Sequence, residues 1–195
     1  MANEIHEAFQ NHPWCLKILK DANYTRVVSG IGNNEVDPFF LKLLHTPSTI
    51  RAVVHLHNIA SQPDRRSEQH ASDVSVSGSP DGMPSVREYL MLLAVGEDTI
   101  GQAGLCHGGF LATLIDEASG RLLAVNRLDG GSSPYTVLLN VTFKAPVAAP
   151  ANILVKSRIT KVEGRKVFLT STVQNDKGVI CVTADVMFVS RKAKL

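Results

Sequence analysis

The hydrophobic and polar positions of this chain predict one long helix followed by four strands. Residues 135–144 alternate, with Val137, Leu139 and Val141 separated from polar Asn140 and Thr142, as expected of a strand with two unlike faces. Residues 153–162, 166–174 and 180–189 are similar apolar stretches bounded by turn residues. Residues 108–126 are apolar at a helical period and lack proline. The second half of the chain therefore predicts an α+β fold.

The first half of the chain is less regular. Residues 2–21 predict a helix interrupted near Pro13, with an apolar stripe of Ile5, Phe9, Leu16 and Leu19. Residues 24–47 are irregular, and residues 50–59 and 86–95 predict two strands rich in valine and leucine. Residues 61–85 are rich in serine and proline, which predicts a long surface loop. We expect an N-terminal extension over residues 1–48 and one domain over 49–195, with this loop inserted.

A single helix that precedes a meander of antiparallel strands must bury its apolar side against the sheet. The simplest architecture is a bent sheet of five or six antiparallel strands wrapped around the helix, with an extra helix at the N-terminus. The 195 residues suffice for one such core.

The composition is that of a globular protein, with 44% hydrophobic and 19% charged residues. The net charge of +2 gives no reason to expect a nucleic-acid partner. No apolar run is long enough to predict a membrane span. Cys15, Cys106 and Cys181 are widely separated, which indicates neither a disulfide framework nor a zinc site and favours a reducing compartment.

The chain ends in Ala193, Lys194 and Leu195, a variant of the Ser-Lys-Leu address that the peroxisomal import receptor reads. Three-residue matches also arise by chance. We therefore expect a peroxisomal or a cytoplasmic protein.

The segment LCHGGFLATLIDEASG, residues 105–120, carries the candidate chemistry. On a helix that starts at the glycine pair, one face collects small residues with one carboxylate among them, namely Gly109, Ala112, Thr113, Asp116 and Gly120. Such a face lets a ligand or another backbone approach closely, and it places Asp116 about two turns from the start of the helix.

Attack on an acyl carbonyl needs an oxyanion donor and a base or nucleophile. Backbone N–H groups of Gly108 and Gly109 at the positive end of a helix suit the first task. Asp116 in apolar surroundings suits the second. Both features also occur without catalysis, since a helix aspartate is usually a solvated residue and a glycine pair is usually a turn.

His107-Gly108-Gly109, followed by an acidic residue nine positions after the histidine, resembles the signature of the PaaI-like and 4-hydroxybenzoyl-CoA-type hot-dog thioesterases. The resemblance is closer to vertebrate thioesterase-superfamily proteins of the carboxyl-terminal-modulator type. It includes the helix residues 112–116 (ATLID), the strand 136–146 (TVLLNVTFKAP) and the stretch 161–166 (KVEGRK). The similarity covers about residues 86–189.

The resemblance implies the hot-dog fold and a homo-oligomer, either a dimer paired edge to edge or a dimer of such dimers, with active sites shared between subunits. It makes Asp116 the catalytic carboxylate and Thr136 a hydroxyl that places the water or the carboxylate. Gly108 becomes the N–H donor to the thioester carbonyl, and His107 shapes the entry of the helix. Glu117 is a weaker candidate, because it points about 100° away from Asp116 on a helix.

Further residues are candidates for substrate binding. Gln102 lies five residues before His107, near the amide position of the PaaI-like enzymes, and Gly109 and Thr113 share the face of Asp116. Cations at a strand and a hairpin of that family are candidates for the phosphates of coenzyme A, or are ordinary solvated cations: Lys144, Arg165 and Lys166.

No metal or other cofactor is expected. His55 and His57 lie on one face of a predicted strand, as two metal ligands would. No carboxylate or cysteine accompanies them in the sequence, so an ordinary strand is favoured.

The functional hypothesis is hydrolysis of an acyl-CoA or related acyl thioester to a carboxylic acid and a thiol. A second hypothesis is release of a polyketide or fatty acyl chain from a carrier protein by the same residues. A dehydratase or hydratase is a third, ranked low because its motifs are absent. A non-enzymatic alternative is an acyl-binding or signalling protein on the same scaffold.

Overall fold

The computed structural model describes residues 6–27, 37–59, 84–126, 128 and 134–190. Most of the loop expected at 61–85, most of the connection 128–134 and the C-terminal tripeptide lie outside the described residues. The division into an extension and a domain at residue 48 stays a prediction.

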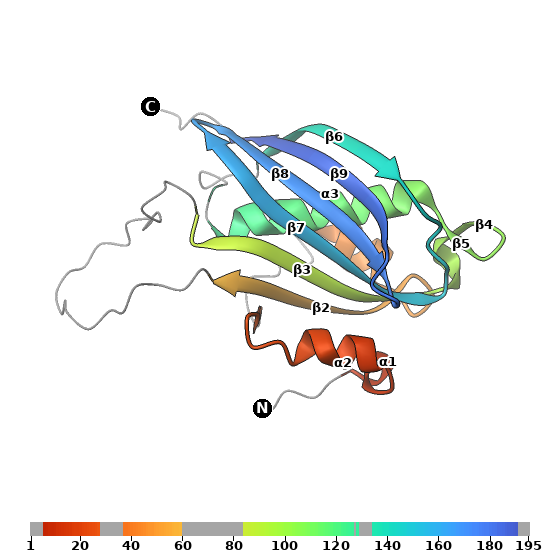
Figure 1. Cartoon of the computed structure of the whole chain (residues 1–195). Helices are drawn as coiled ribbons and strands as arrows, with labels where there is room; N and C mark the ends of the chain where they lie inside the picture. The colour runs from red at the N-terminus through yellow and green to blue at the C-terminus, as the bar shows by residue number, and fades with distance from the viewer. Residues whose placement is uncertain (1–5, 28–36, 60–83, 127, 129–133, 191–195) are drawn as a thin grey trace.

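A single seven-stranded antiparallel sheet forms the body of the molecule, in the order β1-β2-β3-β7-β8-β9-β6 (Figure 1). Six of its strands match the six expected, and the seventh is the two-residue β1, which pairs with β2. The bounds are Thr25–Arg26 (β1), Ile50–Ile59 (β2), Val86–Val95 (β3), Tyr135–Phe143 (β6), Ala151–Glu163 (β7), Lys166–Asn175 (β8) and Ile180–Val189 (β9). The expected α+β fold, a bent sheet around one helix, is confirmed.

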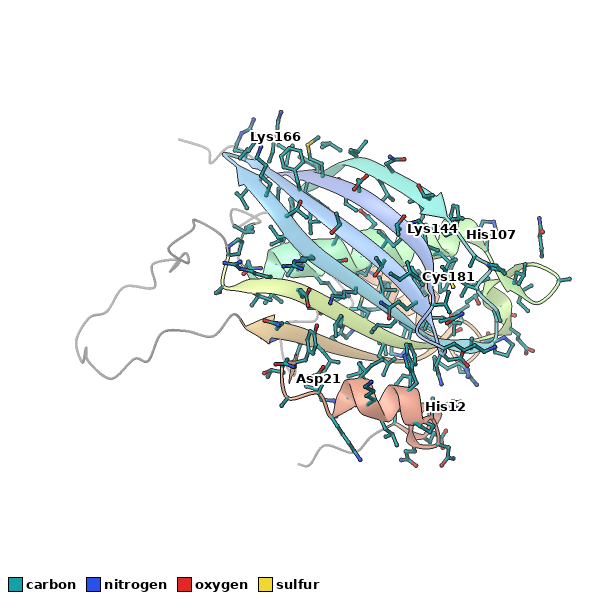
Figure 2. The ribbon with its side chains drawn as sticks, in the orientation of Figure 1. His12, Asp21, His107, Lys144, Lys166 and Cys181 are labelled. Atoms are coloured by element: carbon teal, nitrogen blue, oxygen red, sulfur yellow. The ribbon has the colours of Figure 1, made fainter. Side chains whose placement is uncertain are left out.

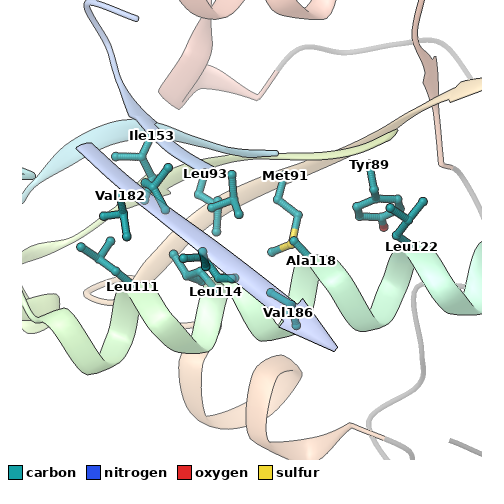
Figure 3. Close-up of a cluster of buried hydrophobic side chains, with 14 of the residues drawn as sticks. Tyr89, Met91, Leu93, Leu111, Leu114, Ala118, Leu122, Ile153, Val182 and Val186 are labelled. Carbon is teal, nitrogen blue, oxygen red and sulfur yellow. The ribbon is translucent and has the colours of Figure 1, made fainter. Parts of the chain in front are cut away.

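Helix α3, Gly108–Val125, runs across the concave face of the sheet. Its apolar side meets the inward positions of the strands, which alternate because successive strand side chains point to opposite faces. Figure 3 shows this core, in which helix residues Leu111, Leu114, Ala118 and Leu122 face Tyr89, Met91, Leu93, Ile153, Val182 and Val186. Full burial of one large side chain contributes roughly 1.5–3 kcal/mol, so this layer fixes the helix on the sheet.

Asn126 ends α3 and joins it to the start of β3. Its side-chain oxygen accepts a hydrogen bond from the Val86 N–H at 3.0 Å, and its amide donates to the Val86 carbonyl at 2.7 Å. The same amide donates to the Leu122 carbonyl, one of the groups that the end of a helix leaves without a partner.

The N-terminal helices cover the other face of the sheet at β2 and β3. They are α1, Glu7–Gln10, and α2, Pro13–Leu19. The expected break before Pro13 is confirmed, because the residue before a proline is disfavoured in a helix, and His12 is extended. The expected stripe was partly wrong: Phe9 is buried, but Cys15 rather than Leu16 is the buried residue of α2. Ile5 lies outside the described residues.

Four short elements were not expected: the helical turns η1, Phe39–Leu44, and η2, Glu97–Thr99, and the hairpin of β4, Ile100–Gln102, with β5, Leu105–Cys106. The hairpin leads directly into α3, and η1 packs beside α3 through the buried Phe40. Both therefore bear on the candidate site.

Candidate active site

His107 is the cap at the start of α3. Its backbone is extended, and its side-chain Nδ1 accepts a hydrogen bond from the Gly109 N–H at 3.0 Å. Nδ1 is thus the unprotonated nitrogen of a neutral ring. The role inferred for His107, shaping the entry of the helix, stays a prediction, and this contact is the one through which it would act.

The cap changes the candidate donors. The Gly109 N–H already donates a hydrogen bond to His107. Gly109 is therefore not an oxyanion donor, contrary to the expectation for the glycine pair. The Gly108 N–H has no hydrogen-bond partner among the described residues. It lies at the positive end of the helix, where a developing negative charge is stabilised.

Close packing at the start of α3 favours glycine. A Cβ at Gly101 would lie 2.7 Å from Cδ2 of the His107 ring, and one at Gly109 would lie 3.0 Å from its Cε1. A Cβ at Gly108 would lie 3.2 Å from Cζ of Phe143. The absence of side chains at these glycines thus allows the rings of His107 and Phe143 to pack closely against the start of the helix.

A pocket of about 650 Å³ opens at this end of α3, a size that suits a small molecule. Four of the sequence-predicted residues line it, namely Gln102, His107, Gly108 and Lys144. Sequence reasoning missed the apolar part of the wall, which includes Leu105, Leu111, Phe143 and Val147. The signal for Phe143 was its position at the end of an alternating strand, beside Lys144.

Asp116 and Thr136 form the second part of the site. The Thr136 hydroxyl donates to Oδ1 of Asp116 at 2.8 Å. Strand β6 places this hydroxyl, because its pairing with β9 sets Thr136 opposite Phe188. Asp116 is half-buried, and burial raises the pKa of its carboxyl, while the hydrogen bond from Thr136 partly lowers it. The carboxylate therefore remains accessible and is a stronger base than an ordinary aspartate.

The two parts of the site are separated along the helix. Asp116 comes eight residues after Gly108, which corresponds to about 12 Å at the rise of an α-helix. Asp116 does not line the pocket at the helix start. The two parts of one chain thus lie too far apart to act on the same thioester carbonyl.

Thr113 lies on the open face of α3 between the two parts, as expected. Its hydroxyl donates to the carbonyl of Gly109 at 3.0 Å, a bond within the helix itself. The hydrogen of this hydroxyl is therefore already in use.

The candidate phosphate-binding cations do not lie together. Figure 2 shows Lys144 beside His107 at one end of the sheet and Lys166 at the other. Lys166 pairs with Val189, which pairs with Tyr135 at the start of β6, whereas Lys144 follows the end of β6. That strand separates them by about 26 Å. Arg165, in the same turn as Lys166, donates to the Ser190 carbonyl at 3.0 Å.

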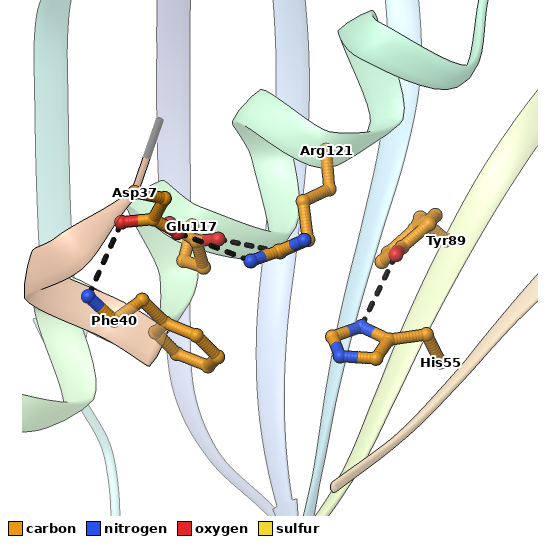
Figure 4. Close-up of polar contacts among 6 residues, drawn as sticks. All are labelled: Asp37, Phe40, His55, Tyr89, Glu117 and Arg121. Carbon is orange, nitrogen blue, oxygen red and sulfur yellow. Dashed lines mark hydrogen bonds and ion pairs between the residues drawn. The ribbon is translucent and has the colours of Figure 1, made fainter. Parts of the chain in front are cut away.

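Glu117 points away from Asp116, as expected, into a cluster with Arg121 and Asp37 (Figure 4). Its carboxylate lies 2.5 Å from Nε of Arg121, and Nη2 of Arg121 lies 3.1 Å from Asp37. Burial and, to a lesser extent, the Asp37 carboxylate raise the pKa of Glu117 to about 7, against the opposing charge of Arg121. The pKa of Glu117 is thus shifted more strongly than that of Asp116. Glu117 nevertheless points away from the face of α3 that carries Asp116.

His55 is buried and accepts or donates a hydrogen bond at Nδ1 with the Tyr89 hydroxyl at 3.1 Å. Burial lowers the pKa of His55 to about 3, so the ring is neutral. Within the described residues, no group of three or more His, Cys, Asp or Glu side chains is arranged to hold a metal ion. None of the described helices is long and apolar enough to cross a membrane.

Comparison with known families gives a match for residues 103–182 to the family model of the thioesterase superfamily. Curated relatives include the mouse acyl-coenzyme A thioesterase THEM4, 32% identical over 90 residues, which cover 46% of this chain and 37% of the relative. The Bos taurus THEM4 is 39% identical over 75 residues, covering 38% of this chain and 29% of the relative. The match thus spans less than half the length of either relative.

Solved structures of similar fold include zebrafish thioesterase superfamily member 2, with a TM-score of 0.50 and 21% identity over 54% of this chain and 75% of that one. A hypothetical thioesterase of Streptococcus pneumoniae TIGR4, solved with coenzyme A, has a TM-score of 0.50 and 19% identity over 55% of this chain and 82% of that one. At these identities the structures bear on the fold alone. Together, these comparisons show that residues 103–182 are similar to the thioesterase superfamily and that the chain has the hot-dog fold.

Proposed function

We propose that this protein hydrolyses an acyl-CoA or a related acyl thioester to a carboxylic acid and a thiol. One observation carries the proposal: a single helix has at its start, at Gly108, an N–H without a hydrogen-bond partner among the described residues, and about two turns later, at Asp116, a half-buried carboxylate. The names of the curated relatives, acyl-coenzyme A thioesterases, support an acyl-CoA as the substrate.

The reaction needs no metal or redox group. Water adds to the thioester carbonyl as Asp116 accepts its proton, and the Gly108 N–H stabilises the oxyanion. Collapse of the tetrahedral intermediate breaks the C–S bond, and the thiolate leaves and takes up a proton. Thr136 occupies Oδ1 of Asp116, which leaves Oδ2 to bind the water. Direct attack by Asp116, followed by hydrolysis of an anhydride, uses the same residues.

The 12 Å between donor and base is bridged if the site is shared by two subunits. Strand β6 is one edge of the sheet and contains no charged residue or proline, although natural edge strands usually carry such protection. It also exposes about half the surface of Tyr135, Val137, Leu138 and Phe143. The opposite edge, β1, has only two residues. We therefore assign β6 as the dimer edge.

Antiparallel pairing of two β6 strands brings the Thr136 end of one strand to the Phe143 end of the other. The Gly108 pocket of one subunit then approaches Asp116 of the second. The same symmetry brings Lys144 of one subunit toward Arg165 and Lys166 of the other, so the cations that are separated within a chain converge on one composite site. A thioester with a phosphate-bearing leaving group fits that arrangement.

The activity is tested by thiol release from acyl-CoAs of graded chain length and aromaticity, with the wild type and Asp116→Asn. Asparagine keeps the acceptor for Thr136 but is not a base. Hydrolysis by the wild type and its loss in the variant support the proposal, and unchanged kcat in the variant refutes it. Tight acyl-CoA binding without thiol release would favour an acyl-binding protein, and turnover only of carrier-bound acyl groups would favour chain release from a carrier.

The shared site is tested by mixing two inactive variants. Gly108→Pro removes the donor N–H at the first position of a helix, where proline is well tolerated, and the extended His107 suits a following proline. Co-expressed Gly108→Pro and Asp116→Asn chains form mixed dimers with one intact composite site. About a quarter of wild-type activity is expected when half of the dimers are mixed. Absence of recovery in dimers shown to be mixed would place both residues in one chain's site.

A further inference from the structure

The cluster of Asp37, Arg121 and Glu117 has no role in the proposed hydrolysis, yet it is built into the core. The Arg121 side chain is 10% exposed and those of Glu117 and Asp37 are 21% and 25% exposed. Burying charged groups costs free energy unless they are paired. The arrangement therefore needs a physical account of its own.

Asp37 connects the cluster to η1. One carboxylate oxygen accepts from the Phe40 N–H at 3.2 Å, and the other accepts from Nη2 of Arg121 at 3.1 Å. The Leu41 N–H donates to the Asp37 carbonyl at 3.1 Å. The buried Phe40 ring lies under the Arg121 guanidinium, 5.2 Å from centroid to Cζ. Arg121 thereby ties the whole segment 37–44 to α3.

The charges of the cluster do not balance when both carboxyls are ionised. Arg121 is the sole cation among the described residues whose charge acts on Glu117, and Asp37 is a second carboxylate beside it. Across the cluster, His55 and Tyr89 are both neutral, since burial lowers the pKa of the first and raises that of the second. The charge of His45, at the end of η1, contributes to lowering the pKa of His55. A proton on Glu117 therefore makes the cluster neutral, and its loss leaves one excess negative charge.

We propose that Asp37, Arg121 and Glu117 form a proton-controlled latch, which holds segment 37–44 against the turn of α3 that carries Asp116. When Glu117 is protonated, its hydroxyl donates to the Asp37 carboxylate, and Arg121 neutralises the remaining charge. When Glu117 is ionised, the two carboxylates repel each other and the segment is held less tightly. Glu117 and Arg121 are positioning residues in this account.

The pKa of Glu117, about 7, puts this change in the neutral range. The carboxyl binds its proton more tightly in the folded than in the unfolded chain. Its contribution to stability is therefore fully present below the ordinary pKa of glutamate and is lost as the pH rises through 7. A latch of this kind is closed at pH 6 and loosened at pH 8.

Thermal unfolding between pH 5.5 and 8.5 tests the latch without reference to catalysis. Glu117→Gln keeps the shape and neutral charge of the protonated form, so its Tm should exceed that of the wild type by about 3 °C at pH 8. This gain should become smaller as the pH falls to 5.5 and toward the ordinary pKa of glutamate. Glu97→Gln, at an exposed carboxyl with no shared buried partner, should show no such trend. A Tm difference for Glu117→Gln that is constant with pH would overturn the proposal.

Asp37→Asn provides a second variant in case Glu117→Gln does not fold. It removes the carboxylate that, in addition to burial, raises the pKa of Glu117 and leaves a neutral pair with Arg121, so the fall in Tm between pH 6 and 8 should become smaller. Retention of the wild-type fall would overturn the latch.

Hydrogen exchange locates the effect. The amides of Phe40 and Leu41 should exchange faster in the wild type as the pH rises through 7, beyond the intrinsic chemical increase, and Glu117→Gln should suppress this excess. Any link to turnover rests on the proposed function. The unfolding and exchange measurements stand even if the protein hydrolyses no thioester, so failure of one proposal is distinguishable from failure of the other.

Discussion

Asp116 and Glu117 are adjacent on one helix and have opposite surroundings. Asp116 faces the open side of α3, where the Thr136 hydroxyl is its side-chain partner among the residues that the structure describes. Glu117 faces η1, where it contacts Arg121 and lies beside Asp37. One step of about 100° around the helix separates a carboxylate on the open face of α3 from one that packs against η1 in an ion-pair cluster.

If Asp116 is the catalytic carboxylate, as we propose, a perturbed pKa does not by itself identify the catalytic group. Glu117 has the larger shift because it is more buried and has a like-charged neighbour. Asp116 has a smaller shift, but one of its oxygens is held in place and the group is half-exposed. Geometry and access decide the assignment.

Neutralising each carboxyl in turn is the most direct test of whether Asp116 and Glu117 have different roles. Asp116→Asn should lower kcat by about 10²–10⁴-fold, the range for loss of a general base. Glu117→Gln at pH 6 should stay within about threefold of wild type, because Glu117 already carries a proton there. Initial rates of thiol release measure both. Equal losses in the two variants would contradict the separation of roles.

The other end of the helix gives the next largest effect. Gly108→Pro should lower kcat by about 10²–10³-fold through loss of one oxyanion donor. Gly108→Ala keeps the N–H and adds the same Cβ beside Phe143, so it serves as the matched control with a loss below about tenfold. If the two variants are equally impaired, crowding against Phe143 rather than the lost donor explains the effect.

The pH dependence of kcat/KM in a Thr136 variant tests the role proposed for Asp116. Thr136→Val removes the hydrogen bond that lowers the pKa of Asp116, so that pKa rises and the active, ionised form is lost at a higher pH. The acid limb of kcat/KM should move upward, with a loss of about tenfold at pH 6 and less at pH 8. Thr113→Val is the control, since its hydroxyl bonds Gly109 instead. A pH-independent loss at Thr136 would exclude this explanation.

Lys144 should give the smallest effect. Lys144→Gln removes a cation from the pocket rim and should raise KM for an acyl-CoA about threefold, less at high salt because exposed charges are screened. Lys161→Gln, at an exposed lysine paired with Glu163 on β7, should leave KM unchanged. A salt-independent change at Lys144 would argue against a phosphate contact.

The long elements could be predicted because their patterns repeat. Residues 50–59, 86–95 and 180–189 match β2, β3 and β9 end to end, since apolar runs bounded by turn residues mark a strand locally. The hairpin β4–β5 and the turns of η1 are too short to show a period. They form because Cys106 donates to Val147, and Asp37 bonds Phe40 and Arg121.

The residues of this chain determined a helix with a glycine pair at its start and an aspartate on its small-residue face, because both are local properties of a 3.6-residue period. A local contact decided which N–H stays available, since the His107 side chain takes the one from Gly109 two residues later, and the longer-range contacts were left to the tertiary structure. It alone placed Thr136 on Asp116 and Asp37 beside Glu117, contacts that join residues 20 and 80 positions apart in the sequence. Sheet register and packing bring such pairs together, and no local pattern encodes them.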